Sequence, residues 1–384
     1  MILTYKNKKY SLNSILLTLL VWSIACFAYD KYNIKILLLF ITLAYNLETI
    51  VNDVINFRKN KIIIIFAIIF PIYLIVTSVL VRGGYLVDAV KGVYVCFFLL
   101  LVLVLEKEEF DICEALYQIL SLLAIMVVVI GLLDLFEISD IYTNPLVLFL
   151  EDIGEGMISR SHNAIFYYVI FIKTSPFFIF NLIYCLEKKR YYMAAISVWA
   201  IMWTGTRAII YLSLILIVVY YIFVVKNKSR SLMFVLIAAI VVIFGFEFFI
   251  NKVEIINFAK NEGDNVRSLI IPSIIKALNE NRLYWIFGMG IGSKYYSLGR
   301  RAYLYGEEIA YVEFLRCYGL IACFILAIFL ILPIKKILKS DYKWVLLPYF
   351  AFLINSTVDP FLFTSTSFLM YLVVYDIYIN KLRG

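Results

Sequence analysis

Residues 112–136 read ICEALYQILSLLAIMVVVIGLLDLF, with Glu114 and Asp134 as the only charged side chains. A helix of about 20 apolar residues is long enough to cross the hydrocarbon core of a bilayer. Backbone groups in lipid must bond to one another, and the run shows no period-two alternation. The stretch is therefore predicted to be a membrane-spanning helix, and the fold follows from the repetition of this pattern along the chain.

The composition of the chain excludes a soluble fold. Of its 384 residues 64% are hydrophobic and 16% are charged, whereas soluble domains average about 25% charged residues. The net charge of +8 is collected in short loops between apolar runs, so it does not indicate nucleic-acid binding. None of the six cysteines forms a CxxC pair, which argues against a metal site or a disulfide framework. We predict a single integral membrane domain over residues 1–384.

Windows of about 20 apolar residues predict an all-α polytopic membrane protein with about twelve transmembrane helices. The first is expected to be a retained helix, because no small-residue cleavage site follows it. The predicted spans are residues 11–29, 34–51, 61–81, 86–105, 112–136, 164–185, 190–206, 208–225, 231–250, 309–334, 343–358 and 361–380.

The distribution of lysine and arginine predicts the orientation of these spans. Cytoplasmic loops of membrane proteins carry an excess of both residues. With the first loop inside, the inner loops are rich in lysine and arginine, and only the one near Lys107 is poor in them. Both termini are then cytoplasmic, and residues 137–163 and 251–309 form a smaller and a larger extracytoplasmic loop.

Two arginines on the predicted outer side are candidate anion ligands. Arg207 lies in the polar turn Thr204-Gly205-Thr206-Arg207-Ala208, where it could grip a phosphate or simply snorkel to the interface. Arg267 follows Asp264, a candidate N-cap, in the first turn of an amphipathic helix that runs to about residue 280. A helix N-terminus favours anions, so the two arginines together suggest a pyrophosphate site. A solvated ion pair is the alternative for Arg267.

The larger loop also contains glycines and carboxylates. Gly288-x-Gly-x-Gly292 follows no predicted strand, so it indicates a bend in the chain rather than a nucleotide site. Glu313 is spaced i,i+3 from Arg316, and the two are predicted to pair with one another. Glu308 has no such partner in the sequence, which makes it the candidate general base, with a plain surface carboxylate as the alternative.

Other polar residues on the predicted outer side are weaker candidates for substrate binding. They include Arg160 and the neighbouring His162, which is the only histidine of the chain. A lone histidine is more often a surface residue. The last outer turn contains Asn355 and Asp359, which could line a cavity or cap two helices. The remaining candidates in the larger loop are Arg300 and Arg301.

The order of several short motifs resembles a known family. They are GTRA at 205–208, an arginine that opens a helix, LYWIFGMGIG at 283–292, an acidic residue, YGL at 318–320 and DPFLFTST at 359–366. This series, over roughly residues 155–370, resembles the O-antigen polymerase and O-antigen ligase superfamily of bacterial envelope glycosyltransferases, which includes the Wzy-type polymerases.

The resemblance implies a GT-C-like membrane fold and a glycan donor carried on undecaprenyl pyrophosphate, with no metal, cofactor or nucleotide sugar. It implies that Arg207 and Arg267 occupy the positions of the two arginines that hold the pyrophosphate in the ligases. Where the ligases have a histidine for the acceptor, spacing to Gly319 places Glu308. This departure weakens the ligase alternative.

The sequence therefore predicts a polymerase of O-antigen, capsule or exopolysaccharide repeat units in the bacterial inner membrane, with an extracytoplasmic active site. Its partners would be the lipid-linked oligosaccharide, membrane lipid, a chain-length regulator and a flippase. In this reading Arg207 and Arg267 hold the donor, Glu308 acts on the acceptor, and Arg300 and Arg301 assist. The alternatives are an O-antigen ligase, a lipid-linked oligosaccharide transporter and a non-enzymatic scaffold.

Overall fold

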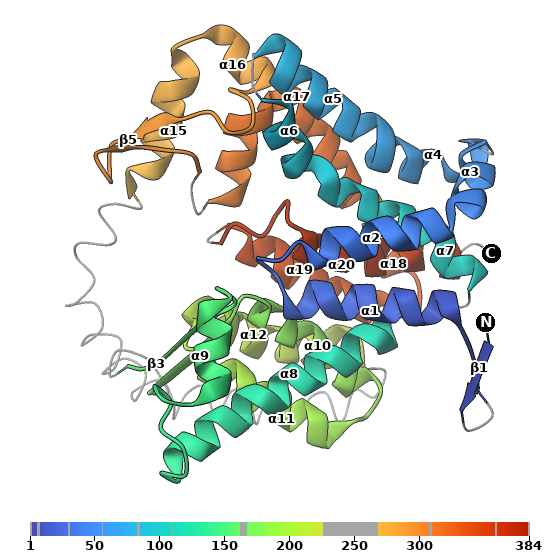
Figure 1. The fold of residues 1–384 in the computed structure, drawn as a ribbon, viewed down its shortest axis with the longest axis vertical. Coiled ribbons are helices and arrows are strands. Elements are labelled where there is room, and N and C mark those ends of the chain that lie inside the picture. The colour runs from blue at the N-terminus through green and yellow to red at the C-terminus, as the bar shows by residue number, and fades with distance from the viewer. Residues whose placement is uncertain are drawn as a thin grey trace.

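The structure is a computed structural model, mostly helical, with the helices stacked roughly side by side across the view of Figure 1. It describes residues 2–5, 8–29, 31–55, 57–82, 85–108, 110–161, 167–225, 268–306, 309–357 and 359–382. The predicted span 231–250 lies outside these residues, as do residues 251–267 and 307–308 of the loop 251–309.

The first half of the chain forms a short hairpin and then a series of helices, several of which are joined end to end. The elements are β1 (Ile2–Tyr5), β2 (Lys8–Ser11), α1 (Leu12–Cys26), α2 (Ile34–Tyr45), α3 (Leu47–Ile55), α4 (Phe57–Ile64), η1 (Ile65–Ile69), α5 (Phe70–Val76), η2 (Thr77–Val81), α6 (Leu86–Val93), η3 (Tyr94–Leu100), α7 (Leu101–Lys107), α8 (Ile112–Leu135), α9 (Pro145–Asp152), β3 (Gly156–Arg160), β4 (Tyr168–Ile172), η4 (Ser175–Phe177) and α10 (Phe178–Glu187).

The second half of the chain contains further helices and two short strands. Its elements are α11 (Tyr191–Trp203), α12 (Arg207–Phe223), α15 (Ile270–Asn279), α16 (Arg282–Phe287), β5 (Tyr295–Ser297), β6 (Ala302–Leu304), α17 (Ala310–Ile331), α18 (Ile334–Leu338), η5 (Lys343–Val345), α19 (Leu346–Asn355), α20 (Ser365–Asp376) and η6 (Ile377–Lys381).

The predicted apolar runs are helical wherever the structure describes them, with one exception. Within the described residues four helices are long and apolar enough to cross a membrane, namely Lys61–Leu80, Leu86–Lys107, Ile112–Leu135 and Ala310–Leu338. A fifth span is possible if α2 and α3, which are bent by 67°, count as one. The remaining apolar helices of the described chain are shorter, so twelve spans and a GT-C-like fold stay predictions.

The exception is the predicted helix over 164–185, whose beginning is instead a strand. Tyr168–Ile172 pairs antiparallel with Gly156–Arg160, and the helical part begins only at Ser175. Alternate residues Tyr168, Ile170 and Ile172 are buried, but every residue of YVIFI is apolar. Hydropathy therefore carried no period-two signal. Together with the β1–β2 and β5–β6 hairpins, this strand corrects the all-α prediction to a mostly helical fold.

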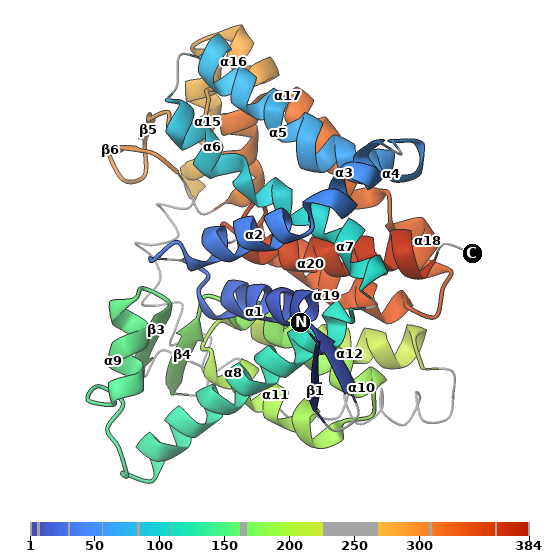
Figure 2. The ribbon, with the colours of Figure 1, turned by 45° about the vertical axis from the view of Figure 1, so that its right-hand side comes forward.

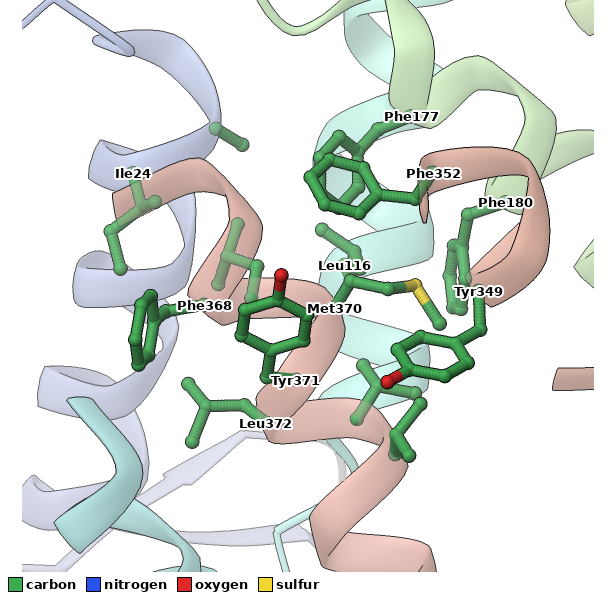
Figure 3. Packing of buried hydrophobic residues seen from close by; sticks show 14 of the residues in the cluster. Ile24, Leu116, Phe177, Phe180, Tyr349, Phe352, Phe368, Met370, Tyr371 and Leu372 are labelled. Carbon is green, nitrogen blue, oxygen red and sulfur yellow. The ribbon is translucent and has the colours of Figure 1, made fainter. Parts of the chain in front are cut away.

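Helix α20 is the centre of the hydrophobic core. All its residues are buried, as expected for a helix that is packed on every side. Figure 3 shows Phe368, Met370 and Tyr371 of α20 among side chains of α1, α8, η4, α10 and α19. Thr364 and Ser367 form a capping box at its start, which satisfies N–H groups that would otherwise be unpaired.

The loop elements gather at one end of the helix stack. Figures 1 and 2 both show α9, the β3–β4 hairpin and the β5 strand on the left, and the C-terminus on the right. We call the end that carries α9, the β3–β4 hairpin and the β5–β6 hairpin the loop end. Parts of both predicted outer loops, 137–163 and 251–309, therefore lie at the same end.

Two glycines allow the chain after α16 to cross α17 at backbone distance. Gly288 and Gly319 both have a φ of 77°, and Gly319 forms a kink inside α17. A Cβ atom at Gly288 would lie 2.3 Å from the carbonyl oxygen of Cys317, and one at Gly319 would lie 2.4 Å from the nitrogen of Gly288. The amide nitrogens of Met289 and Gly290 donate to carbonyl oxygens of α17 at 2.7 and 3.0 Å. The predicted bend is thus a close contact between two backbones.

This crossing predicts that Gly319→Ala destabilises the protein. The new methyl group would clash with the backbone of Gly288, and an alanine at positive φ is strained, so we expect a loss of about 2 kcal/mol or more in the free energy of unfolding. Gly306→Ala is the control, because its Cβ would meet only Glu313 Oε1, at 3.6 Å. Denaturation of the purified protein in detergent measures both, and equal midpoints would contradict the prediction.

Candidate active site

Arg207 begins helix α12 at the loop end. Gly205, at a φ of 70°, packs so tightly on β4 that a Cβ there would lie 2.8 Å from Val169. Val169 is paired with Ser159, the neighbour of Arg160. The turn before α12 is thereby fixed against the β3–β4 hairpin. The Arg207 side chain is half-buried, and among the described residues it makes no ion pair.

Arg160 is held by a carboxylate of another helix. Its Nε and Nη2 donate to Asp134 Oδ2 and Oδ1 at 2.8 and 2.6 Å. The Asp134 side chain is only 2% exposed and lies near the end of α8. The geometry is bidentate, which is the strongest form of an arginine–carboxylate contact. Arg160 therefore attaches the β3–β4 hairpin to α8.

Asp134 accepts hydrogen bonds from several residues, a role that was not predicted from the sequence. It also accepts hydrogen bonds from the amide of Ile141, at 2.7 Å, and from the hydroxyl of Tyr168, at 3.0 Å. Burial, together with the bond to Asp134, raises the pKa of Tyr168 to about 12. A carboxylate inside an apolar run is a signal of a specific partner, and this signal could have identified Asp134.

The last turn before α20 also lies at the loop end. Asn355 is buried and donates from Nδ2 to Asp359 Oδ2 at 3.0 Å, while its Oδ1 makes no hydrogen bond within the described chain. The hydroxyl of Tyr311 donates to the carbonyl oxygen of Leu353 at 2.9 Å. Because Tyr311 is in the first turn of α17, this bond brings the start of α17 to the end of α19.

Helices α12 and α19 run antiparallel, which places Arg207 at the same end as Asn355. The amine of Lys343, in η5 before α19, donates to the carbonyl oxygen of Phe223 at the far end of α12, at 2.8 Å. The two helices are in contact. The start of α12 therefore lies toward the end of α19, where α17 also begins.

Arg316 ties the larger loop to α17. Its side chain is fully buried, and it pairs with Glu313 at 2.6 Å, as the i,i+3 spacing predicted. Its Nη1 donates to the carbonyl and hydroxyl oxygens of Ser293 at 2.9 and 2.7 Å, and its Nη2 donates to the carbonyl of Tyr305 at 2.9 Å. The guanidinium thus holds both ends of the segment that contains the β5–β6 hairpin. The sequence predicted the local pair but not these distant partners.

The hairpin held in this way carries Arg300 and Arg301 at its exposed tip. Tyr296 and Tyr303 are 43% and 69% exposed, and their ring centroids lie 5.4 Å apart. Arg301 adopts a φ of 50° in the tight turn. Two cations and two aromatic rings are therefore presented together at the loop end.

Several of the predicted site residues lie at the same end of the helix stack, on different elements. Arg160 and the hairpin with Arg300 and Arg301 belong to loop-end elements, and the contacts above place Arg207, Asn355 and Asp359 toward the same end. Glu308, Arg267 and His162 lie outside the described residues. Among the residues that are described, histidine, cysteine and carboxylate side chains form no cluster that could hold a metal ion.

Comparison with known proteins supports the resemblance given above. A family model described as O-antigen ligase matches residues 192–314, which is less than half of the chain. The match includes Arg207, Arg267, Arg300, Arg301 and Glu308, and it stops short of Asn355 and Asp359. No curated protein matches the chain.

The different surroundings of Arg160 and Arg207 predict different effects of their removal. Arg160→Ala leaves the buried carboxylate of Asp134 without its cation, so we expect a measurable loss in the free energy of unfolding. Arg207→Ala removes no ion pair of the described chain, and we expect a change within about 0.5 kcal/mol. Denaturation of both variants in one detergent compares them directly. A larger effect at Arg207 would refute this assignment of roles.

Proposed function

We propose that this protein, which belongs to the O-antigen ligase and polymerase superfamily, is a membrane glycosyltransferase that polymerises oligosaccharide repeat units carried on undecaprenyl pyrophosphate. The observation that carries the proposal is Arg207. It is a half-buried guanidinium at the start of a helix, within the family match, and it makes no ion pair among the described residues.

The chemistry of the donor requires such a group. When the glycosidic bond to pyrophosphate breaks, negative charge grows on the leaving phosphate oxygens. A preorganised cation placed at that point stabilises the transition state more than the ground state. The guanidinium can bind two phosphate oxygens at once, and the free N–H groups of the first turn of α12 add to its field. In this proposal Arg267 is the second ligand and no metal is required.

The acceptor needs a group that orients and deprotonates its attacking hydroxyl. We assign this role to Glu308, because a carboxylate within hydrogen-bond reach can act as a general base. The position immediately precedes α17, whose first turn is tied to the end of α19 through Tyr311. Asn355, Asp359 and His162 are assigned to substrate binding, with Arg300 and Arg301 at the hairpin tip. Arg160 contributes by holding the β3–β4 hairpin in place.

The proposed orientation places the loop end outside the inner membrane of a bacterium and both termini in the cytoplasm. Basic residues collect in the predicted inner loops, which supports this orientation. The lipid-linked donor would then present its glycan at the outer face. A flippase would supply the donor, and a chain-length regulator would act on the product.

The ligase is the alternative that a specific observation favours, because the matching family model is described as O-antigen ligase. The two activities share a donor and differ in the acceptor. A polymerase extends another lipid-linked repeat unit, whereas a ligase transfers the glycan to lipid A core. Glutamate at 308, where the ligase pattern has histidine, supports the polymerase.

Reconstitution with a synthetic undecaprenyl pyrophosphate repeat unit tests the proposal. We expect a ladder of lipid-linked glycans on a gel from the unmodified protein. Arg207→Ala should lower the initial rate by about 10²–10³-fold, because one ligand of the developing charge is lost. Arg207→Lys, which keeps the charge but not the bidentate geometry, should retain more activity.

The controls separate the alternatives. Exposed Ala195 lies on α11, away from the proposed site, and Ala195→Leu should leave the ladder unchanged. A single transfer that requires lipid A core would establish the ligase. Gradient-dependent uptake without any glycan product would establish a transporter. A full ladder from Arg207→Ala would refute the role of Arg207.

A further inference from the structure

A cleft of about 210 Å³ opens beside the first turns of α17. It lies between this helix and the turn that leads to α20, with Gly92 of α6 on a third side. The residues around it are Gly92, Ala310, Glu313, Phe314, Cys317, Tyr318, Pro360, Leu362 and Phe363. Most of this lining is apolar, and Glu313 is its only charged side chain.

The carboxylate of Glu313 is fixed from behind and open toward the cleft. Its Oε1 and Oε2 accept hydrogen bonds from Arg316 at 2.6 and 2.8 Å. The side chain of Arg316 is fully buried, whereas that of Glu313 is 20% exposed. Three further hydrogen bonds to the loop, two to Ser293 and one to Tyr305, hold the guanidinium in place, so it sets the direction of the carboxylate.

The cleft is not suited to an anion. Each of the five N–H groups of Arg316 already has an oxygen acceptor, in Glu313, Ser293 or Tyr305. No guanidinium donor is left for a phosphate, and the negative charge of Glu313 would repel one. The pyrophosphate of a donor must therefore bind at another part of the protein than this cleft.

The cleft is suited to a neutral ligand that donates hydrogen bonds. A carboxylate offers about four acceptor positions. Arg316 occupies one at each oxygen, and the thiol of Cys317 lies 3.3 Å from Oε1. At least one position stays open to a hydroxyl group, and a hydroxyl bound to a carboxylate makes a strong, charge-assisted bond.

The wall of the cleft is aromatic. The ring centroid of Phe314 lies 4.6 Å from that of Tyr318 and 5.2 Å from that of Phe363. Sugar rings have apolar C–H faces and hydroxyl edges, so one sugar can pack on these rings while it donates to Glu313. A hydrocarbon chain would fill the apolar part but would desolvate the carboxylate without a partner.

We propose that this cleft is a subsite for one neutral sugar ring of the glycan substrate, with Glu313 as the hydroxyl acceptor and Arg316 as the residue that positions it. The assignment to a glycan substrate rests on the proposed function. The binding of a sugar can be measured without catalysis, so the two can fail separately.

The test is saturation-transfer NMR on the full-length protein in nanodiscs, with a panel of neutral methyl glycosides of common hexoses and N-acetylhexosamines as probes. We expect saturable transfer to at least one glycoside. Glu313→Gln should weaken its binding at least about tenfold, because a charge-assisted bond is worth about 1.5–3 kcal/mol. This change also leaves Arg316 without its carboxylate partner. The second variant is therefore Ala310→Leu, which narrows the cleft and keeps the ion pair. Ala195→Leu is the matched control.

The outcomes decide the proposal. Binding that is lost in both cleft variants and kept in the control would support the subsite, even if reconstitution shows no glycan ladder. In that case only the proposed function would fail. No saturable transfer from the unmodified protein, or equal transfer from Ala310→Leu and its control, would overturn the subsite. In the polymerisation assay, Ala310→Leu should raise the KM for the repeat unit more than it lowers kcat.

Discussion

The arrangement of the loop end depends on one buried guanidinium. A charge that is removed from water destabilises the fold unless it is paired and all its donors find acceptors. Arg316 meets this condition with the carboxylate of Glu313 on its own helix and with oxygens of Ser293 and Tyr305 in the loop. If the loop moved away, two or more N–H groups would be left unbonded in a buried site. The loop is therefore held in place because the buried guanidinium needs the loop oxygens as hydrogen-bond acceptors.

This anchor works because the backbone can come close enough. Gly288 and Gly319 let the segment after α16 cross α17 with no side chain between them. Just before the kink, the carbonyl oxygens of Arg316 and Cys317 accept hydrogen bonds from loop amides, and the side chain of Arg316 donates to loop carbonyls. The glycines and the arginine therefore act on the same contact. Neither would fix the hairpin without the other.

Hydropathy predicted most helices, because a membrane-length apolar run leaves few other solutions for the backbone. It did not predict the strand Tyr168–Ile172, since a strand that is apolar on both faces has the same composition as a helix of the same length. The Glu313–Arg316 pair could be predicted from its i,i+3 spacing. The bonds of Arg316 to Ser293 and Tyr305 could not, because a backbone carbonyl has no signature in the sequence. Asp134 and Arg160 are also separated by an entire helix and turn, so only the tertiary structure pairs them.

The arginines of the loop end can be ranked by the donors that remain available to a ligand. Arg316 uses all five N–H groups within the protein, and Arg160 directs its fork at Asp134. Both stabilise the loop end. Arg316 has no donor left for a phosphate, whereas Arg160 has Nε and Nη2 committed to Asp134. Arg207 has no ion pair within the described chain, yet its backbone is fixed by the contact of Gly205 with Val169. An arginine whose backbone is held in place and whose N–H groups are available is preorganised for an anion. From the sequence Arg316 is predicted to pair with Glu313, whereas Arg160 and Arg207 are both candidates for substrate binding. Only the contacts in the structure distinguish Arg160, which is bound to Asp134, from Arg207, which makes no ion pair within the described chain.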